Sequence, residues 1–407
     1  MNLITLILTI AILFGITDFL TERYPRLQRD IFYIALALVS FLFTIKYYYG
    51  PDIASYVPFY DVVPSLSYII AHSDKLPYSF EPGYAIFCRV LKDMGVSFYW
   101  MTAIVSVFYF VAVLLLFRHI ERKKAFALAI LVVMDYKCIF ATYRQCLAVG
   151  LFILMVLCMQ NRKYLWALLL AFLTAFCHKS GIFVVSVVLF YYMVRGKWVQ
   201  PYVYQLLLLL LLVVFILPIA HVSMDVLTGL PLPHSYISSL RHHLSLGRQV
   251  QTVFLVYAVT LVYISHFAQY RHTRAQAFAS VALIGLVIVA LTYQYFYLLE
   301  RVRSYFLPIV IVYVFGLVQK AEDEKRHVPY GALLKQLASV VLLVFMIHTV
   351  QGHHSSASQL KNNVYRSCTV FDLIDHRPCD VQKSQMDLAL RYWQEDFMKN
   401  EQNRIPQ

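Results

Sequence analysis

Apolar runs about as long as a membrane is thick recur along the whole chain, and short polar or basic segments separate them. A helix needs roughly 20 residues to cross the ~30 Å hydrocarbon core of a bilayer, so the pattern predicts about twelve membrane-spanning helices. We expect these helices at Leu3–Phe19, Ile31–Ile45, Ser97–Phe117, Ala125–Ala141, Gln145–Met159, Tyr164–Cys177, Gly181–Val194, Val203–His221, Val250–Phe267, Gln276–Leu298, Ser304–Gln319 and Tyr330–Val350.

The composition supports this interpretation. Of the 407 residues, 60% are hydrophobic and only 14% are charged, which is too apolar for a soluble protein of this length. The first apolar run has no basic segment before it and is followed by Arg23, Arg26 and Arg29, so we expect a retained span and not a cleaved signal peptide. The predicted fold class is therefore an all-α, polytopic integral membrane protein.

The net charge of +13 is concentrated in short connections between the predicted spans. Because basic loops stay on the cytoplasmic side, this distribution places both termini outside the cell. Orientation in the membrane thus explains the positive charge. A nucleic-acid partner is not needed to explain it, and we exclude one. Sixteen Lys and Arg residues fall in six connections, at residues 21–30, 118–124, 161–163, 195–202, 268–275 and 320–329.

Residues 46–96 form the longest early connection on the predicted outer side. They contain Gly50-Pro51-Asp52 followed by Tyr56, and later Glu81-Pro82-Gly83-Tyr84, so two carboxylates stand beside Gly/Pro turns. Beyond the second motif, apolar residues recur at helical spacing against charged ones, which predicts an amphipathic helix at the membrane interface. Single surface carboxylates are usually solvated or cap a helix, and that alternative applies to both of them.

Arg144, His178 and Arg301 stand at polar interruptions between apolar runs, where we expect the chain to turn on the outer side. Ionisable groups in or beside a bilayer are costly to keep, so a functional role is the first hypothesis. The hairpin arms around Arg144 and His178 rise only roughly 23–28 Å, slightly less than the bilayer core. We therefore expect the three residues to line one outward-facing cavity, with Asp52 and Glu81 at its mouth. A locally thinned bilayer with snorkelling side chains is the alternative.

Two further charged residues precede Arg144. Lys137 would share a helix face with Arg144, about 10 Å away, if the fourth span stays helical over these seven positions. Asp135 would point elsewhere and could neutralise a cation on another span.

Five motifs together resemble a known family. They are Gly50-Pro51-Asp52 with Tyr56, Glu81-Pro82-Gly83-Tyr84, Arg144-Gln145, His178-Lys179-Ser180, and Arg301 followed by Tyr305-Phe306. In this order they resemble EpsG-like membrane proteins, the Wzy-type polymerases of O-antigen, capsule and exopolysaccharide. The resemblance covers roughly residues 40 to 310.

The resemblance implies a GT-C-like membrane glycosyltransferase of the bacterial plasma (inner) membrane. Such an enzyme joins polyprenyl-diphosphate-linked oligosaccharide repeat units on the outer face, so donor and acceptor are both lipid-linked glycans. Its implied partners are the lipid bilayer and a chain-length regulator and flippase of the same pathway. We expect a transmembrane catalytic domain at residues 1–350, with external loops at 46–96 and 222–249, and an extracytoplasmic tail at 351–407.

The chemistry of this reaction suggests candidate catalytic residues. A diphosphate leaving group needs its developing charge stabilised, and the planar guanidinium groups of Arg144 and Arg301 suit phosphate oxygens. His178 could take the proton of the acceptor hydroxyl, and Asp52 or Glu81 could replace or orient it. Alternatively, His178 is a turn residue that bonds the backbone. The candidates for substrate binding are Lys179, Arg303, Tyr305, Lys137, Tyr84 and Gln145.

No metal or cofactor site is predicted. His242-His243, with His234 upstream, lacks the acidic and cysteine neighbours of a metal site, and no nucleotide-binding, CxxC or hydrolase-elbow motif is present. Cys368 and Cys379 stand in the polar tail and could form a disulfide. The remaining cysteines are expected to be small buried hydrophobic residues.

Three rival functions remain open at this point. The first is an O-antigen ligase or another glycosyltransferase that uses lipid-linked sugars. The second is a flippase or transporter of lipid-linked glycan, although the chain shows no internal repeat and its polar residues gather on one side. The third is a membrane acyltransferase with His178 as its base.

Overall fold

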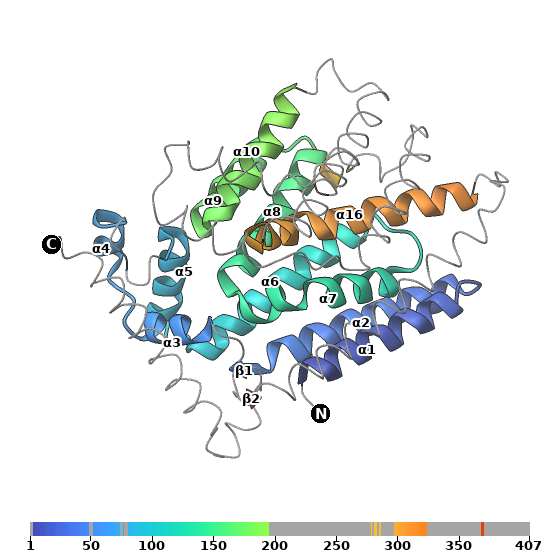
Figure 1. The fold of residues 1–407 in the computed structure, drawn as a ribbon, viewed down its shortest axis with the longest axis horizontal. Helices are drawn as coiled ribbons and strands as arrows, with labels where there is room; N and C mark the ends of the chain where they lie inside the picture. The colour runs from blue at the N-terminus through green and yellow to red at the C-terminus, as the bar shows by residue number, and fades with distance from the viewer. Residues whose placement is uncertain are drawn as a thin grey trace, which may run out of the picture.

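The computed structural model describes residues 3–48, 52–73, 76, 80–194, 278, 281–282, 285, 297–323 and 368–369. This part of the chain is helical apart from two short strands (Figure 1). The helices are α1 (Leu3–Leu20), α2 (Pro25–Thr44), α3 (Ile53–Asp61), α4 (Leu66–Ala71), α5 (Pro82–Asp93), α6 (Phe98–Phe117), α7 (Lys124–Ala141), α8 (Tyr143–Gln160), α9 (Tyr164–Cys177), α10 (Lys179–Val194) and α16 (Tyr297–Asp323). The strands are β1 (Lys46–Tyr48) and β2 (Cys368–Thr369).

Four of the described helices, α1, α2, α6 and α8, are long and apolar enough to cross a membrane, and α9 is a shorter apolar helix. The prediction of an all-α, multi-pass membrane protein is therefore confirmed. The predicted spans Val203–His221, Val250–Phe267 and Tyr330–Val350, and most of Gln276–Leu298, lie outside the described residues. Loop 222–249, His234, His242, His243 and Cys379 lie outside them as well.

The helix boundaries differ from the sequence prediction at two informative places. Helix α2 begins at Pro25, six residues before the apolar run, because proline suits the first helical position, where no N–H partner is needed. Helix α16 begins at Tyr297, so Arg301 lies inside a helix. The turn that we predicted at Arg301 is therefore wrong. Polar residues interrupt the apolar pattern there without interrupting the helix.

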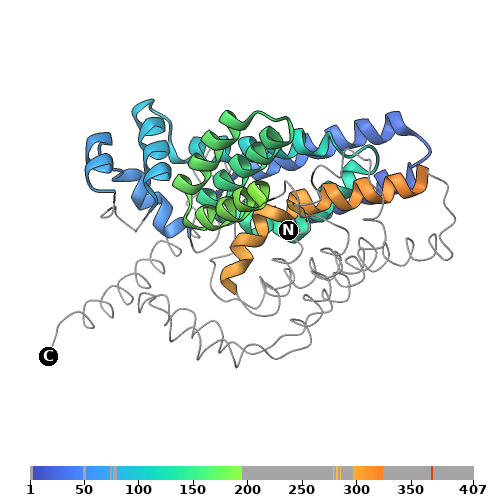
Figure 2. The same ribbon diagram turned by 90° about the horizontal axis from the view of Figure 1, so that it is seen from above.

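Helices α1, α2 and α7 pack together along one side of the bundle (Figures 1 and 2). At Gly15, an added Cβ would lie 2.9 Å from the Cβ of Ala129, so glycine allows α1 to approach α7 closely. One buried carboxylate oxygen of Asp18 accepts hydrogen bonds from the backbone N–H groups of Ala125 (2.7 Å) and Phe126 (3.1 Å). Asp18 thus satisfies the first free donors of α7 from a neighbouring helix.

Helices α8, α9 and α10 pack together, α6 packs against α8, and α16 packs against both α7 and α8. Glycine again sets the spacing between helices. A Cβ at Gly150 would lie 2.6 Å from the ring of Phe108 on α6. At Gly181 it would lie 2.5 Å from the carbonyl oxygen of Thr174, so glycine permits the sharp turn that joins α9 to α10.

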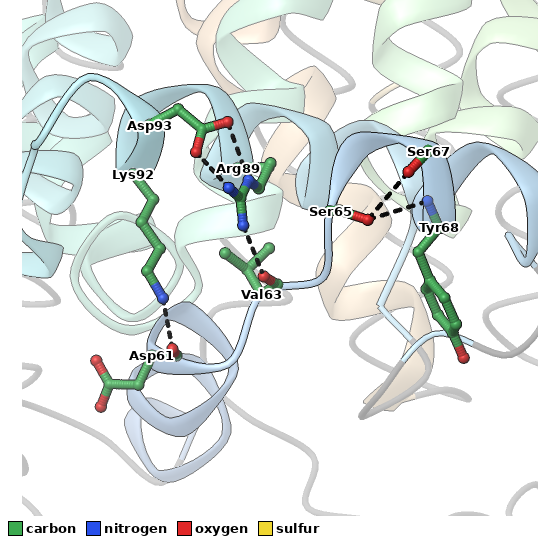
Figure 3. Close-up of polar contacts among 8 residues, drawn as sticks. All are labelled: Asp61, Val63, Ser65, Ser67, Tyr68, Arg89, Lys92 and Asp93. Carbon is green, nitrogen blue, oxygen red and sulfur yellow. Dashed lines mark hydrogen bonds and ion pairs between the residues drawn. The ribbon is translucent and has the colours of Figure 1, made fainter.

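Helices α3, α4 and α5 lie together at one end of the bundle in both views (Figures 1 and 2). Figure 3 shows how α5 is held there: Arg89 Nη1 donates to the carbonyl of Val63 at 3.4 Å, and Lys92 donates to the carbonyl of Asp61. Ser65 accepts a bond from the N–H of Tyr68 and caps α4. This end of the molecule carries Asp52 and Glu81.

We predict that Asp18→Ala destabilises the protein, because it leaves the N–H groups of Ala125 and Phe126 buried without an acceptor. The expected cost is roughly 1–3 kcal/mol, measured as a lower melting temperature in detergent. Asp30→Ala is the matched control. Asp30 is 56% exposed and, among the described residues, pairs with its neighbour Arg29, so its loss should leave the melting temperature unchanged. Equal melting temperatures for both variants would contradict the capping role of Asp18.

Candidate active site

Arg144 stands in the first turn of α8, directly after a break in the helical path. Thr142 has φ −109° and ψ 77°, which is not helical, and it separates α7 from α8. The Thr142 hydroxyl donates to the carbonyl of Cys138 at 2.9 Å, so the side chain helps to end α7. One continuous helix was the condition for placing Lys137 on the face of Arg144, and this condition is not met. Nothing is described of the Lys137 side chain itself.

Glu81 joins the starts of three helices. It precedes α5, its Oε2 accepts from Arg144 Nη1 on α8 at 2.6 Å, and its Oε1 accepts from the backbone N–H of Lys179 on α10 at 3.0 Å. The carboxylate is 7% exposed and makes no cap hydrogen bond to its own helix. Glu81 is thus a buried anchor between helices, and it caps the start of α10 instead of its own helix.

The glycine of the same motif explains how Glu81 reaches this position. A Cβ at Gly83 would lie 2.7 Å from the backbone carbonyl atoms of Phe176, near the end of α9. Only glycine therefore lets the start of α5 approach the end of α9 this closely. That approach brings the Glu81 carboxylate to the first N–H of α10.

Aromatic rings surround the guanidinium of Arg144. Its Cζ lies 4.2 Å from the ring centroid of Phe80 and 5.6 Å from that of Tyr56, both within cation–π range. Arg144 Nε also donates to the Tyr56 hydroxyl at 3.4 Å. The Tyr56 ring in turn meets Tyr84 and Tyr143 edge to face, with centroids 5.8 and 5.3 Å away. Arg144 is therefore held by one ion pair and a rigid aromatic wall.

His178 lies in the turn that joins α9 to α10, outside both helices. Its Nδ1 lies 2.7 Å from the hydroxyl oxygen of Ser180 and accepts from the backbone N–H of Ser180 at 3.2 Å. The Ser180 hydroxyl also lies 3.2 Å from the hydroxyl of Tyr305 on α16. His178 is only 6% exposed, so its ring is fixed by the turn and by α16.

Arg301 and Asp52 are the remaining two residues that we predicted as catalytic. The exposed Arg301 is placed by its backbone carbonyl, which accepts a hydrogen bond from the buried amide of Gln145 on α8. Arg301 is within electrostatic reach of both His178 and Tyr56. Asp52 precedes α3, makes no cap hydrogen bond and is within electrostatic reach of Tyr56. Four of the five residues predicted as catalytic, Glu81, Arg144, His178 and Arg301, thus lie in one cluster, and among the described residues Asp52 is connected to it only through Tyr56.

The electrostatics of the site keep Glu81 charged and His178 neutral. Burial raises the pKa of Glu81, but Arg144 and the N–H of Lys179 oppose it, and the resulting pKa lies below its usual value. Burial lowers the pKa of His178 to about 4; Glu81 counteracts this in part, whereas Arg144 and Arg301 reinforce it. At neutral pH the imidazole is therefore uncharged and the carboxylate is ionised.

The residues predicted to bind substrate differ in their exposure: three of those described below are buried, and Lys179 is exposed. Arg303 is buried, and its Nη2 donates to the carbonyl of Met134 on α7 at 3.0 Å. This hydrogen bond joins α16 to α7. Tyr84 is fully buried among the aromatic rings, and Tyr305 is fully buried beside Ser180. Lys179 exposes its side chain next to the cluster while its backbone holds Glu81.

Sequence reasoning missed the residues that hold the cluster in place. The fully buried Lys46 on β1 donates to the carbonyl of Ile139 near the end of α7 at 2.7 Å. Its Nζ also lies 4.8 Å from the ring centroid of Tyr143, the neighbour of Arg144. Strand β1 itself pairs antiparallel with β2, so a piece of the tail lies beside it. Ser180 was named in the His178-Lys179-Ser180 motif, but the sequence alone gave it no role.

Within the described residues, no group of three or more His, Cys, Asp or Glu side chains could hold a metal ion. The charges available to a ligand at this site are those of Arg144, Arg301, Lys179 and Asp52. An anionic group would meet three cations here, next to the starts of α8 and α10. Helix starts carry partial positive charge and free N–H donors, which also favour an anion.

We predict that Glu81→Gln destabilises the protein strongly, because Arg144 loses its counter-charge in a largely buried position. The expected cost is roughly 3 kcal/mol, seen as a lower melting temperature. The matched control is Asp93→Asn, which removes the partner of Arg89 at an aspartate that is 53% exposed (Figure 3). That exposed pair should contribute about 0–1 kcal/mol. If Glu81→Gln and Asp93→Asn have the same melting temperature, Glu81 is not the anchor that we describe.

The chain was compared with known families, curated proteins and solved structures. The model of the EpsG family matches residues 31–363, which is most of the chain. No curated protein and no solved structure matches it. The family match includes every residue of the cluster, and it confirms the resemblance that the motifs indicated. The chain therefore belongs to the EpsG family, a family of Wzy-like polymerases.

Proposed function

We propose that this protein is a polysaccharide polymerase, a glycosyltransferase that joins polyprenyl-diphosphate-linked oligosaccharide repeat units on the outer face of the bacterial plasma membrane. Membership of the EpsG family and the apolar helices support this assignment. The observation that carries it is the position of Arg144. The chain maintains a largely buried arginine beside Arg301 and His178, and this arrangement suits a diphosphate.

The arginine arrangement leaves donors for a ligand. Arg144 uses Nη1 for Glu81 and Nε for Tyr56, and its Nη2 makes no hydrogen bond to a described residue. Arg301 is exposed and uses only its backbone to bond Gln145. Two guanidinium groups could thus hold the diphosphate oxygens as the negative charge develops. The aromatic wall of Tyr56 and Phe80 keeps the Arg144 fork in one orientation.

The reaction has a simple balance of atoms. The acceptor hydroxyl oxygen forms a bond to the anomeric carbon of the donor, and the bond from that carbon to the diphosphate oxygen breaks. The diphosphate leaves with the electron pair, and the hydroxyl proton passes to a base. Glu81 is a poor candidate for this base because both of its oxygens already accept hydrogen bonds. Asp52 and His178 remain.

We also propose an orientation in the membrane and an arrangement of all the spans. About twelve spans in a GT-C-like arrangement would place both termini and the cluster on the outer side, as the basic connections indicate. Residues 1–350 would form the catalytic domain and residues 351–407 an extracytoplasmic tail. O-antigen, capsule and exopolysaccharide are the product classes, and a flippase and a chain-length regulator of the same pathway would be its partners.

Reconstitution with purified lipid-linked repeat units tests the function. We expect the wild-type protein to produce a ladder of lengthened glycans, and Arg301→Ala to lower the rate about 100-fold through the loss of one charged donor. Arg29→Ala is the control, because its side chain is 63% exposed on α2 and lies outside the cluster. A wild-type protein that moves single units across a vesicle membrane without extending them would contradict the polymerase and indicate a flippase.

Cysteine labelling in intact cells tests the orientation. A cysteine at Lys179, exposed beside the cluster, should react with a membrane-impermeant maleimide added from outside. A cysteine at Arg162, exposed in the connection between α8 and α9, should react only after the membrane is opened. The wild-type protein gives the background from its native cysteines. The opposite pattern for the two positions would reverse the proposed topology.

A further inference from the structure

We propose that His178 acts as a hydrogen-bond donor through Nε2–H toward the diphosphate, and that the proton of the acceptor hydroxyl goes to Asp52. This inference rests on the proposed function, and it divides the labour among the residues of the cluster. It follows from the hydrogen bonds of the two ring nitrogens.

The backbone of Ser180 determines which ring nitrogen of His178 carries the proton. An amide N–H can only donate, and that of Ser180 points at Nδ1 from 3.2 Å. A proton on Nδ1 would face the amide proton directly. Nδ1 is therefore an acceptor, and in the neutral ring the single proton sits on Nε2.

The Ser180 hydroxyl reinforces this tautomer. Its oxygen lies 2.7 Å from Nδ1, and the hydroxyl is also placed to donate to the Tyr305 hydroxyl at 3.2 Å. Because Nδ1 already accepts from the backbone N–H of Ser180, we assign the single hydroxyl proton to the shorter contact. Two donors from the same residue then converge on Nδ1. The pair holds the ring in one orientation, with Nε2 on the opposite side.

A nitrogen that carries a proton cannot take another while the ring stays neutral, and this ring resists a second proton. Burial and the cations Arg144, Arg301 and Lys179 all disfavour imidazolium, and the pKa of His178 is about 4. A base is needed to remove the hydroxyl proton, and here both ring nitrogens are unsuited to it. As a donor, by contrast, Nε2–H adds a neutral contact beside two guanidinium groups.

Of the three candidate bases, His178, Glu81 and Asp52, the last is left to take the proton. Glu81 has both oxygens occupied, whereas the Asp52 carboxylate makes no hydrogen bond to a described residue and is partly exposed. It lies at the start of α3, within electrostatic reach of Tyr56, whose hydroxyl contacts Arg144. Asp52 thus lies four residues before Tyr56, and among the described residues no hydrogen bond occupies its carboxylate.

A matched pair of amides tests the role of His178 in the ladder assay. His178→Gln places an amide N–H near the position of Nε2, whereas His178→Asn places one near Nδ1 and does not reach the substrate. We expect His178→Gln to keep about a tenth or more of the wild-type rate and His178→Asn to lose about 100-fold, as for a lost oxyanion donor. Equal, near-complete loss in both variants, each with a wild-type melting temperature, would overturn the donor role.

A spectroscopic measurement tests the tautomer independently of the reaction. In protein labelled with ¹⁵N-histidine, the signals absent from His178→Gln belong to His178. We expect an unprotonated Nδ1 and a protonated Nε2 at pH 7, and a protonated Nδ1 would overturn the inference. If the wild-type protein shows this tautomer but makes no ladder, the proposed polymerase fails and the tautomer assignment stands.

Discussion

The ion pair between Glu81 and Arg144 is the interaction on which the candidate site depends. Glu81 begins one helix, Arg144 stands in the first turn of a second, and the other oxygen of Glu81 receives the first N–H of a third. A charge this far from water must be paired or it costs several kcal/mol. The three helix starts therefore cannot separate without leaving an unpaired charge, and the site keeps its shape without a ligand.

The same ion pair also leaves the site ready for an anion. Glu81 accepts a hydrogen bond from only one guanidinium nitrogen of Arg144, Nη1. Among the described residues, the donors on Nη2 remain without an acceptor. The aromatic rings of Tyr56 and Phe80 exclude water from its flank and fix its plane. Arg301 and Lys179 contribute positive charge without being tied through their side chains to Glu81. Cations that looked alike in the sequence thus differ in the structure: Arg144 is paired with Glu81, whereas the side chains of Arg301 and Lys179 are exposed.

Sequence patterns predicted the helices well, and they predicted two of the three turns. The boundaries of α6, α7, α8, α9 and α1 agree within two residues with the apolar runs, since a membrane span must be apolar along its full length. The turn at Arg301 was wrong because arginine is compatible with a helix, so a break in hydrophobicity is not a break in the backbone. The breaks that we predicted around Arg144 and His178 are confirmed, because Thr142 separates α7 from α8 and His178 separates α9 from α10.

The sequence by itself determined the membrane class, the helical periodicity and the identity of the charged residues, because each depends on composition or local spacing. It also indicated the family, since five motifs in order are a property of the chain. Only the tertiary structure decided which atoms meet. Gly83 lets α5 touch α9, Gln145 places Arg301, and Glu81 joins Arg144 to the start of α10. Such contacts join residues up to 156 positions apart, and their hydrogen-bond geometry exists only once the helices have packed.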